Sequence, residues 1–170
     1  MADPAQAGVG AWGDEGAHAV DLLRWLTGRE VERVMLALGT VTGRYGDVDE
    51  HGEALLELDG GVLATVGAGW VDRGDIVQLE AAGTEGHAWV AGRRLWVVSE
   101  RLGGADGSQP WADLPDPLPH AFTLFLDALA GRPDVPLVDV RDAAATTAVL
   151  RAAYEAADRG TWAWPAPTST

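Results

Sequence analysis

The order of hydrophobic patterns along this chain is the feature that most constrains its fold. Apolar residues recur with a helical period over residues 14–27, alternate as in strands through residues 31–99, and become helical again over 120–130 and 139–159. Strands joined by short turns pair antiparallel, whereas a parallel sheet needs a longer connection between its strands. The sequence therefore predicts an α+β fold with a large, open, mostly antiparallel sheet and helices packed on one face. It excludes a parallel nucleotide-binding sheet.

Turn residues divide the strand-rich region into short segments. The expected strands cover residues 31–42, 51–58, 62–70, 76–82, 87–91 and 95–99. The Asp-Gly-Gly run at 59–61 is typical of a hairpin turn, and the proline- and glycine-rich stretch 101–119 predicts a long surface connection. For a chain of 170 residues we expect one domain, with an irregular lead-in at 1–13, a core over 14–165 and a tail at 166–170.

The first helical segment has recognisable ends and an apolar stripe. Asp14 is a suitable N-cap residue, and Gly28 follows the last turn, where a left-handed residue commonly ends a helix. The stripe expected to pack on the core consists of Ala19, Leu22, Leu23 and Leu26.

A second face of this helix carries ionisable side chains. The residues within about 60° of one another on this face are Asp14, His18, Asp21 and Trp25. A carboxylate one turn before an imidazole can accept its N–H and raise its basicity, while the helix N-terminus favours the neutral ring. Asp14 and His18 are therefore candidate catalytic residues that exchange a proton with a hydroxyl near neutral pH. The simpler alternative is that Asp14 only caps the helix and His18 is solvated.

Composition narrows the classes of partner. The formal charge is −14, from 26 acidic residues against 12 basic residues, all of them arginine. Such a surface repels nucleic acid and anionic membranes but leaves a neutral sugar or polyol unaffected. No apolar run approaches the roughly 20 residues of a membrane helix, and the first residues do not resemble a signal peptide, so we expect a cytoplasmic protein. Without cysteine or spaced histidines, we predict no metal site.

Four further features have simple interpretations. Residues 8–13 match the dinucleotide-binding pattern G-x-G-x-x-G, but no buried strand precedes them, so we expect no cofactor binding there. His51 lies among acidic residues and is expected in a solvated turn, with a cation site as the alternative. Trp25 is expected to pack. The strand tryptophans are expected in the core or in a subunit contact, with a sugar-stacking wall as the alternative; they are Trp70, Trp89 and Trp96.

The polar helix face belongs to a longer motif. Residues 14–26 read Asp-x-Gly-x-His-x-x-Asp-Leu-Leu-x-Trp-Leu, after a glycine-rich loop and before Gly28. This motif resembles the opening of the C-terminal domain in the Gfo/Idh/MocA family, which includes glucose–fructose oxidoreductase and inositol dehydrogenase. The similarity extends over residues 8–165, through the strands, residues 122–131, the segment 136–143 with its alanine-rich helix, and a short terminal strand.

The resemblance implies roles for particular residues. Asp14 and His18 match the pair that contacts sugar hydroxyls and relays a proton in the family. Asp21 also matches and is predicted to bind substrate, although it could instead position the helix. The other predicted substrate-binding residue, Trp70, comes from the sugar-stacking alternative and not from the motif. The family's glycine fingerprint and its Glu-Lys-Pro segment, with the catalytic lysine, belong to an N-terminal Rossmann domain. This chain has neither feature and contains no lysine.

These observations lead to one expected function and three alternatives. We expect the substrate-side domain or subunit of an oxidoreductase that acts on a sugar- or polyol-like hydroxyl compound. It would bind no cofactor alone, would need NAD(P) on a separate Rossmann domain or subunit, and would form a homodimer through its sheet face. The alternatives are a non-catalytic ligand-binding or scaffold dimerisation module, a cofactor-free isomerase or lyase, and an unrelated α+β binding fold.

Overall fold

The computed structural model describes residues 8–74 and 78–167, and it confirms an α+β protein with antiparallel sheets. The chain divides into two compact units. Unit 1 contains the residues up to Asp72 and those from Pro136 onward, and unit 2 spans Arg73–Val135. The single domain expected from the chain length stays a prediction.

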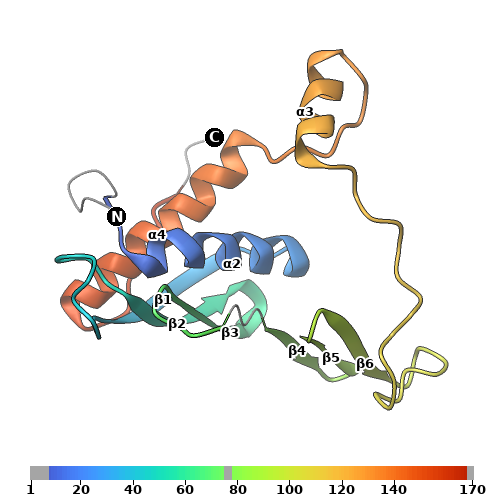
Figure 1. Ribbon diagram of the computed structural model, residues 1–170, viewed down its shortest axis with the longest axis horizontal. Coiled ribbons are helices and arrows are strands. Elements are labelled where there is room, and N and C mark those ends of the chain that lie inside the picture. Colours follow the sequence, from blue (N-terminus) through green and yellow to red (C-terminus); the bar gives the residue numbers. More distant parts are fainter. Residues whose placement is uncertain (1–7, 75–77, 168–170) are drawn as a thin grey trace. The chain divides into compact units, whose positions relative to one another are not determined.

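Unit 1 consists of a three-stranded antiparallel sheet and two helices that pack on one of its faces (Figure 1). Its elements are α2 (Ala11–Thr27), β1 (Val31–Gly39), β2 (His51–Leu58), the short 3-10 turn η1 (Asp59–Gly61), β3 (Val62–Gly69) and α4 (Val140–Arg159). The strand order is β1-β2-β3, and η1 forms the predicted hairpin connection. Helices on one face of the sheet confirm that part of the sequence prediction.

The core of unit 1 lies between the sheet and the helices. Alternate side chains of β1 and β2 point towards the helices, and the alanine-rich face of α4 allows that helix to approach the sheet closely. The buried residues include Trp12, Val20, Val34, Leu36, Ala54, Leu56, Leu58, Val66, Val149, Ala152, Ala153 and Ala156. The opposite face of the sheet is not covered by these helices.

The ends of α4 follow the sequence signals. Asp139 caps the helix in a capping box with Asp142, and Gly160 ends it in the left-handed conformation, with φ of 65°. After this helix, Ala163 exchanges two backbone hydrogen bonds with Val34 of β1, at 2.9 and 3.0 Å. The expected terminal strand is therefore a single antiparallel bridge at the edge of β1.

A buried arginine connects the two helices of unit 1. The Arg24 guanidinium donates Nε and Nη2 to the carboxylate of Glu30, at 2.8 and 2.7 Å. Its Nη1 donates to the backbone oxygen of Asp142 and to Oγ1 of Thr146, both at 3.0 Å. All three guanidinium nitrogens are thus bonded, which is how a charged side chain that is only 8% exposed is tolerated.

Replacement of Arg24 by alanine is expected to lower the free energy of unfolding by about 2–3 kcal/mol, because Thr146 and the Asp142 carbonyl lose a buried donor. Arg29→Ala is the matched control, since Arg29 pairs with Asp59 at 2.8 Å but its side chain is 41% exposed. The control is expected to cost less than about 1 kcal/mol. Urea denaturation of both variants checks this, and equal losses would contradict a structural role specific to Arg24.

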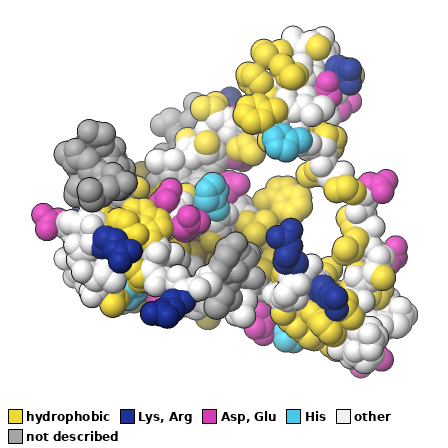
Figure 2. All heavy atoms as spheres, viewed as in Figure 1, with side chains coloured by type: hydrophobic (Ala, Val, Ile, Leu, Met, Phe, Trp, Pro, Cys, Tyr) yellow, Lys and Arg dark blue, Asp and Glu magenta, His cyan; other side chains and the backbone are white. Residues whose placement is uncertain are grey.

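Unit 2 contains a second three-stranded antiparallel sheet, in the order β4-β5-β6. Its elements are β4 (Leu79–Gly83), β5 (Gly86–Ala91), β6 (Arg94–Ser99) and α3 (Ala121–Leu129). Gly92 and Arg93, both with positive φ, form the tight turn between β5 and β6. Trp89 and Trp96 lie opposite each other with parallel rings, and Figure 2 shows hydrophobic side chains exposed over α3.

The prediction of one large sheet was wrong, because the described residues form two small sheets. The chain leaves the first ladder after Gly69, where the Trp70 N–H bonds to the Glu50 carbonyl at 3.0 Å. Pairing resumes at Leu79 with a different partner, and residues 76 and 77 of the expected fourth strand lie outside the described residues. Within the described part of the chain, no helix is both long and apolar enough to cross a membrane.

Candidate functional site

The helix that carries the predicted site begins at Ala11, three residues before the predicted N-cap Asp14. Asp49, from the loop before β2, supplies the cap instead. Its carboxylate Oδ2 accepts the Trp12 N–H at 2.8 Å, and its backbone oxygen accepts the Ala11 N–H at 2.9 Å. Because this cap comes from a distant residue, Asp14 does not serve as the N-cap, and its side chain is exposed.

Tyr154 of α4 completes the arrangement at the N-terminus of α2. Its hydroxyl donates to Oδ1 of Asp49 at 2.9 Å and accepts the Gly13 N–H at 3.0 Å. Burial, together with the hydrogen bond to Asp49, raises the pKa of Tyr154 to about 12, so the phenol keeps its proton at physiological pH. The hydroxyl therefore acts as a permanent donor to Asp49, and α2 is held at a defined position relative to α4.

The glycines of the G-x-G-x-x-G pattern serve this arrangement. A Cβ at Gly10 would overlap the Asp49 carboxylate, and one at Gly13 would lie 2.9 Å from the Tyr154 hydroxyl oxygen. The two glycines thus admit a carboxylate and a phenol to the helix N-terminus, where a dinucleotide fingerprint would hold phosphate. The residues of this loop do not fit a pyrophosphate group, because the negatively charged Asp49 carboxylate already accepts the Trp12 N–H at the start of the helix.

Asp14 belongs to a cluster of side chains from three segments of unit 1. Its Oδ2 accepts a hydrogen bond from Nε1 of Trp70 at 3.2 Å. Trp70 follows β3 and is half-buried, and the ring of Tyr45, from the loop between β1 and β2, packs edge-on against it with centroids 5.1 Å apart. We call Asp14, Trp70 and Tyr45 the tryptophan cluster. The structure therefore brings together two of the predicted site residues, Asp14 and Trp70.

His18 and Asp21 differ in their surroundings. His18 is exposed one helical turn after Asp14, so both side chains of the predicted catalytic pair reach solvent from α2. Asp21 is half-buried, and its Oδ1 accepts the Thr146 hydroxyl of α4 at 3.3 Å, beside the Arg24 network. That contact matches the alternative in which Asp21 positions the helix.

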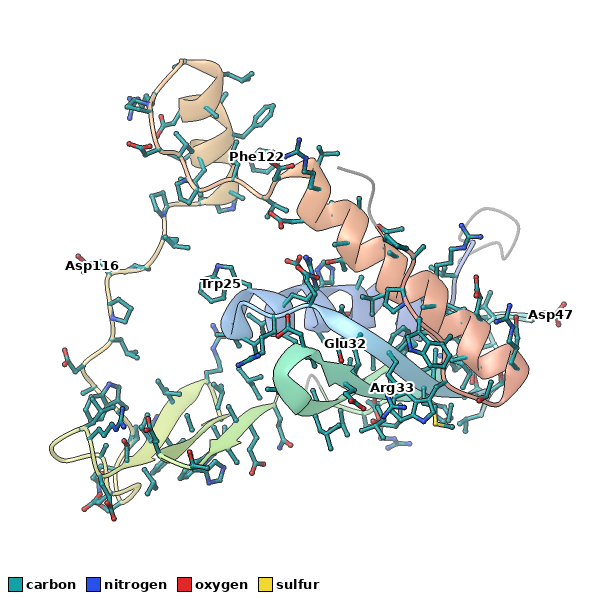
Figure 3. All side chains as sticks on the ribbon, turned by 180° about the vertical axis from the view of Figure 1, so that it is seen from behind. Trp25, Glu32, Arg33, Asp47, Asp116 and Phe122 are labelled. Carbon is teal, nitrogen blue, oxygen red and sulfur yellow. The ribbon has the colours of Figure 1, made fainter. Side chains whose placement is uncertain are left out.

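The buried side of α2 differs from the predicted stripe. It follows positions 12, 16, 20 and 24, where Gly16 leaves room for the ring of Trp12. Leu22 and Leu26 are consequently 41% and 49% exposed. Trp25 is 71% exposed and points away from unit 1 in Figure 3, so the prediction that it packs was wrong. The buried Arg24, next to it in sequence, takes the position that faces α4.

Glu50 was missed by the sequence analysis, which expected the acidic residues near His51 in a solvated turn. Its side chain is fully buried and accepts four hydrogen bonds from the loop that follows β1. The donors are the backbone N–H groups of Val41, Thr42 and Arg44 and the hydroxyl of Thr42. Burial alone would raise the pKa of Glu50, but the Thr42, Val41 and Arg44 donors outweigh it and hold the pKa at about 2.

The protein is expected to lose stability in acid as Glu50 binds a proton. The folded pKa of about 2 lies below the ordinary value of 4.5, so the contribution of Glu50 is complete above about pH 4.5 and is lost as the pH falls towards 2. Urea midpoints measured across this range check the prediction. Glu50→Gln should flatten the acid decline, whereas Glu53→Gln, at an exposed strand position, should not; equal slopes in the two variants would contradict it.

Comparisons with known proteins agree with this fold. Residues 1–89 match the family model described as the GFO/IDH/MocA C-terminal domain. An NAD binding oxidoreductase from Klebsiella pneumoniae superposes with a TM-score of 0.78 at 20% identity, covering 98% of this chain and 53% of that one. An aldose-aldose oxidoreductase from Caulobacter crescentus gives a TM-score of 0.78 at 22% identity, covering 95% of this chain and 49% of that one. Levoglucosan dehydrogenase gives a TM-score of 0.75 at 22% identity, covering 98% of this chain and 53% of that one.

The extent of these matches defines what the chain represents. It spans about half the length of the solved structures that it matches. No curated protein matches it by sequence. The family model covers just over half of the chain, including α2, the whole sheet of unit 1 and the tryptophan cluster. The chain therefore belongs to the Gfo/Idh/MocA family and corresponds to its C-terminal domain.

Proposed function

We propose that this chain is the substrate-side domain of an oxidoreductase that acts on a sugar- or polyol-like compound. The observation that carries the proposal is the exposure of Asp14 and His18 one turn apart on α2, with Asp14 held by the Trp70 indole. Similar proteins include an aldose-aldose oxidoreductase and a levoglucosan dehydrogenase, which supports a carbohydrate as the substrate class.

Each side chain has a distinct role in this proposal. The oxygen of Asp14 that is not bonded to Trp70 accepts a hydrogen bond from one substrate hydroxyl and so orients the ring. The imidazole of His18 takes the proton of the hydroxyl that becomes a carbonyl. Oxidation also needs a nicotinamide cofactor as hydride acceptor. The N-terminus of α2 does not fit the pyrophosphate of such a cofactor. A separate NAD(P)-binding domain or subunit would supply it.

Two titrations of the isolated chain test this division of roles. NADH fluorescence is expected to remain unchanged as protein is added. Levoglucosan or glucose, added to ¹⁵N-labelled protein, is expected to shift the indole N–H signal of Trp70 and the backbone signals around His18. Asp14→Ala should abolish these shifts. Tight NADH binding, or sugar-induced shifts confined to β4–β6, would contradict the proposal.

A homodimer through the open face of the sheet is a second part of the proposal. This face presents exposed apolar side chains from each strand, namely Met35, Leu55 and Leu63. Beside them Arg33, labelled in Figure 3, pairs with Glu57, and its guanidinium carbon lies 4.6 Å from the centroid of the Trp162 ring. A sheet face with an exposed apolar side chain on every strand supports a subunit contact, although Arg33, Glu53 and Glu57 lie on the same face. It equally favours the alternative of a scaffold dimerisation module.

Light scattering after gel filtration tests the dimer. Wild-type protein is expected to elute as a dimer. Leu55→Asp, in the middle of the central strand, is expected to yield a folded monomer, because it places a charge in the contact. Val41→Asp serves as the control, since Val41 is exposed in the loop after β1. A monomeric wild-type protein would contradict the proposed contact.

A further inference from the structure

We infer that Tyr45 and Trp70 form a stacking wall that selects a cyclic sugar over an acyclic polyol, an inference that rests on the proposed function. Trp70 connects the proposed hydroxyl acceptor, Asp14, with the aromatic wall. Its indole N–H donates to Asp14, and its ring packs against Tyr45. A hydroxyl held by Asp14 therefore places the rest of the substrate beside these aromatic rings.

The position of Tyr45 is determined by a buried charge. The Arg44 N–H, immediately before Tyr45, donates to Oε1 of Glu50 at 2.9 Å. Glycines at 43 and 46, on either side, have positive φ of 65° and 81°, which an L side chain rarely adopts. The backbone oxygen of Glu50 also accepts the Trp70 N–H at 3.0 Å. One fully buried residue thus holds both aromatic residues in place.

The chemistry of the wall points to a ring-shaped ligand. A pyranose presents several C–H groups on one rigid face, which packs on an aromatic surface without further loss of conformational freedom. An acyclic polyol with the same hydroxyls must first be ordered to present such a face. The tryptophan cluster therefore combines a hydroxyl acceptor, Asp14, with a surface that discriminates the shape of the carbon skeleton.

The experiment compares methyl β-D-glucopyranoside with sorbitol as probes of the full chain, using NMR titration of the Trp70 indole signal. The glucoside is expected to bind about tenfold more tightly than sorbitol. Tyr45→Leu should lower that ratio by weakening glucoside binding, because only Trp70 then remains of the wall, and Tyr45→Phe should preserve it. Trp164→Ala, an exposed tryptophan outside the cluster, is the aromatic control and should not change the ratio.

The outcomes separate this inference from the function on which it rests. Equal binding of both probes, abolished for both by Asp14→Ala, would overturn the stacking wall and leave the substrate-side role intact. A Tyr45→Leu variant that folds, as judged by circular dichroism, and keeps the full preference would also overturn the wall. Binding of neither probe at concentrations that saturate typical sugar sites would overturn both the wall and the proposed function.

Discussion

Replacement of His18 by alanine is expected to lower sugar-dependent formation of NAD(P)H about 10²- to 10⁴-fold, measured with the separate NAD(P)-binding domain that the proposed function requires. The imidazole of His18 is the proposed proton acceptor, and α2 carries no second histidine that could replace it. Because the His18 side chain is exposed, its removal should leave the melting temperature nearly unchanged. Turnover numbers and thermal melts of the same preparations measure the two effects separately.

The control for this variant is Glu15→Ala. Glu15 is also exposed on the first turns of α2 but lies outside the proposed site, so its replacement should preserve turnover. Asp14→Asn, which keeps the shape but removes the charge, should raise KM more than it lowers kcat, because Asp14 is proposed to orient the substrate. Undiminished turnover in His18→Ala would remove this residue from the chemistry.

Gly10→Ala is expected to lower the free energy of unfolding by about 3 kcal/mol, the second large effect. The added Cβ would overlap the Asp49 carboxylate and lie 2.5 Å from the Asp49 backbone oxygen. Asp49 would have to move, and the Trp12 N–H and the Tyr154 hydroxyl would lose their partner. Urea denaturation gives the size of the loss.

Two comparisons identify the cause of that loss. Gly10 has φ of −92°, which alanine adopts without strain, so the effect is expected from the steric overlap alone. Gly8→Ala is the opposite case, since its φ of 69° disfavours alanine while the space around it is open, and it should cost about 1 kcal/mol. If Gly10→Ala were stable but weakened NADH binding, the glycines would belong to a nucleotide loop instead.

Several elements could be predicted because their signals are local. Strand β2 was expected at its observed bounds, 51–58, from alternating residues that end at the Asp-Gly-Gly turn. The third helical segment, 139–159, has its N-cap and capping box within its own sequence and its terminal glycine directly after it. Gly28 ends α2 in the left-handed conformation, as expected. These features depend on residues within a few positions of one another, so a single stretch of sequence contains the necessary information.

The sequence by itself determined the helices, the strand segments, the antiparallel pairing and the motif that indicates the family. Only the tertiary structure decided that Asp49 caps α2, that Glu50 is buried among loop amides, and that Tyr45 packs against Trp70. It also divided the expected sheet into two. Each of these contacts depends on how the folded chain brings segments together, which neighbouring residues do not encode. An acidic residue in a loop has the same sequence around it whether its carboxylate is solvated or buried among backbone amides.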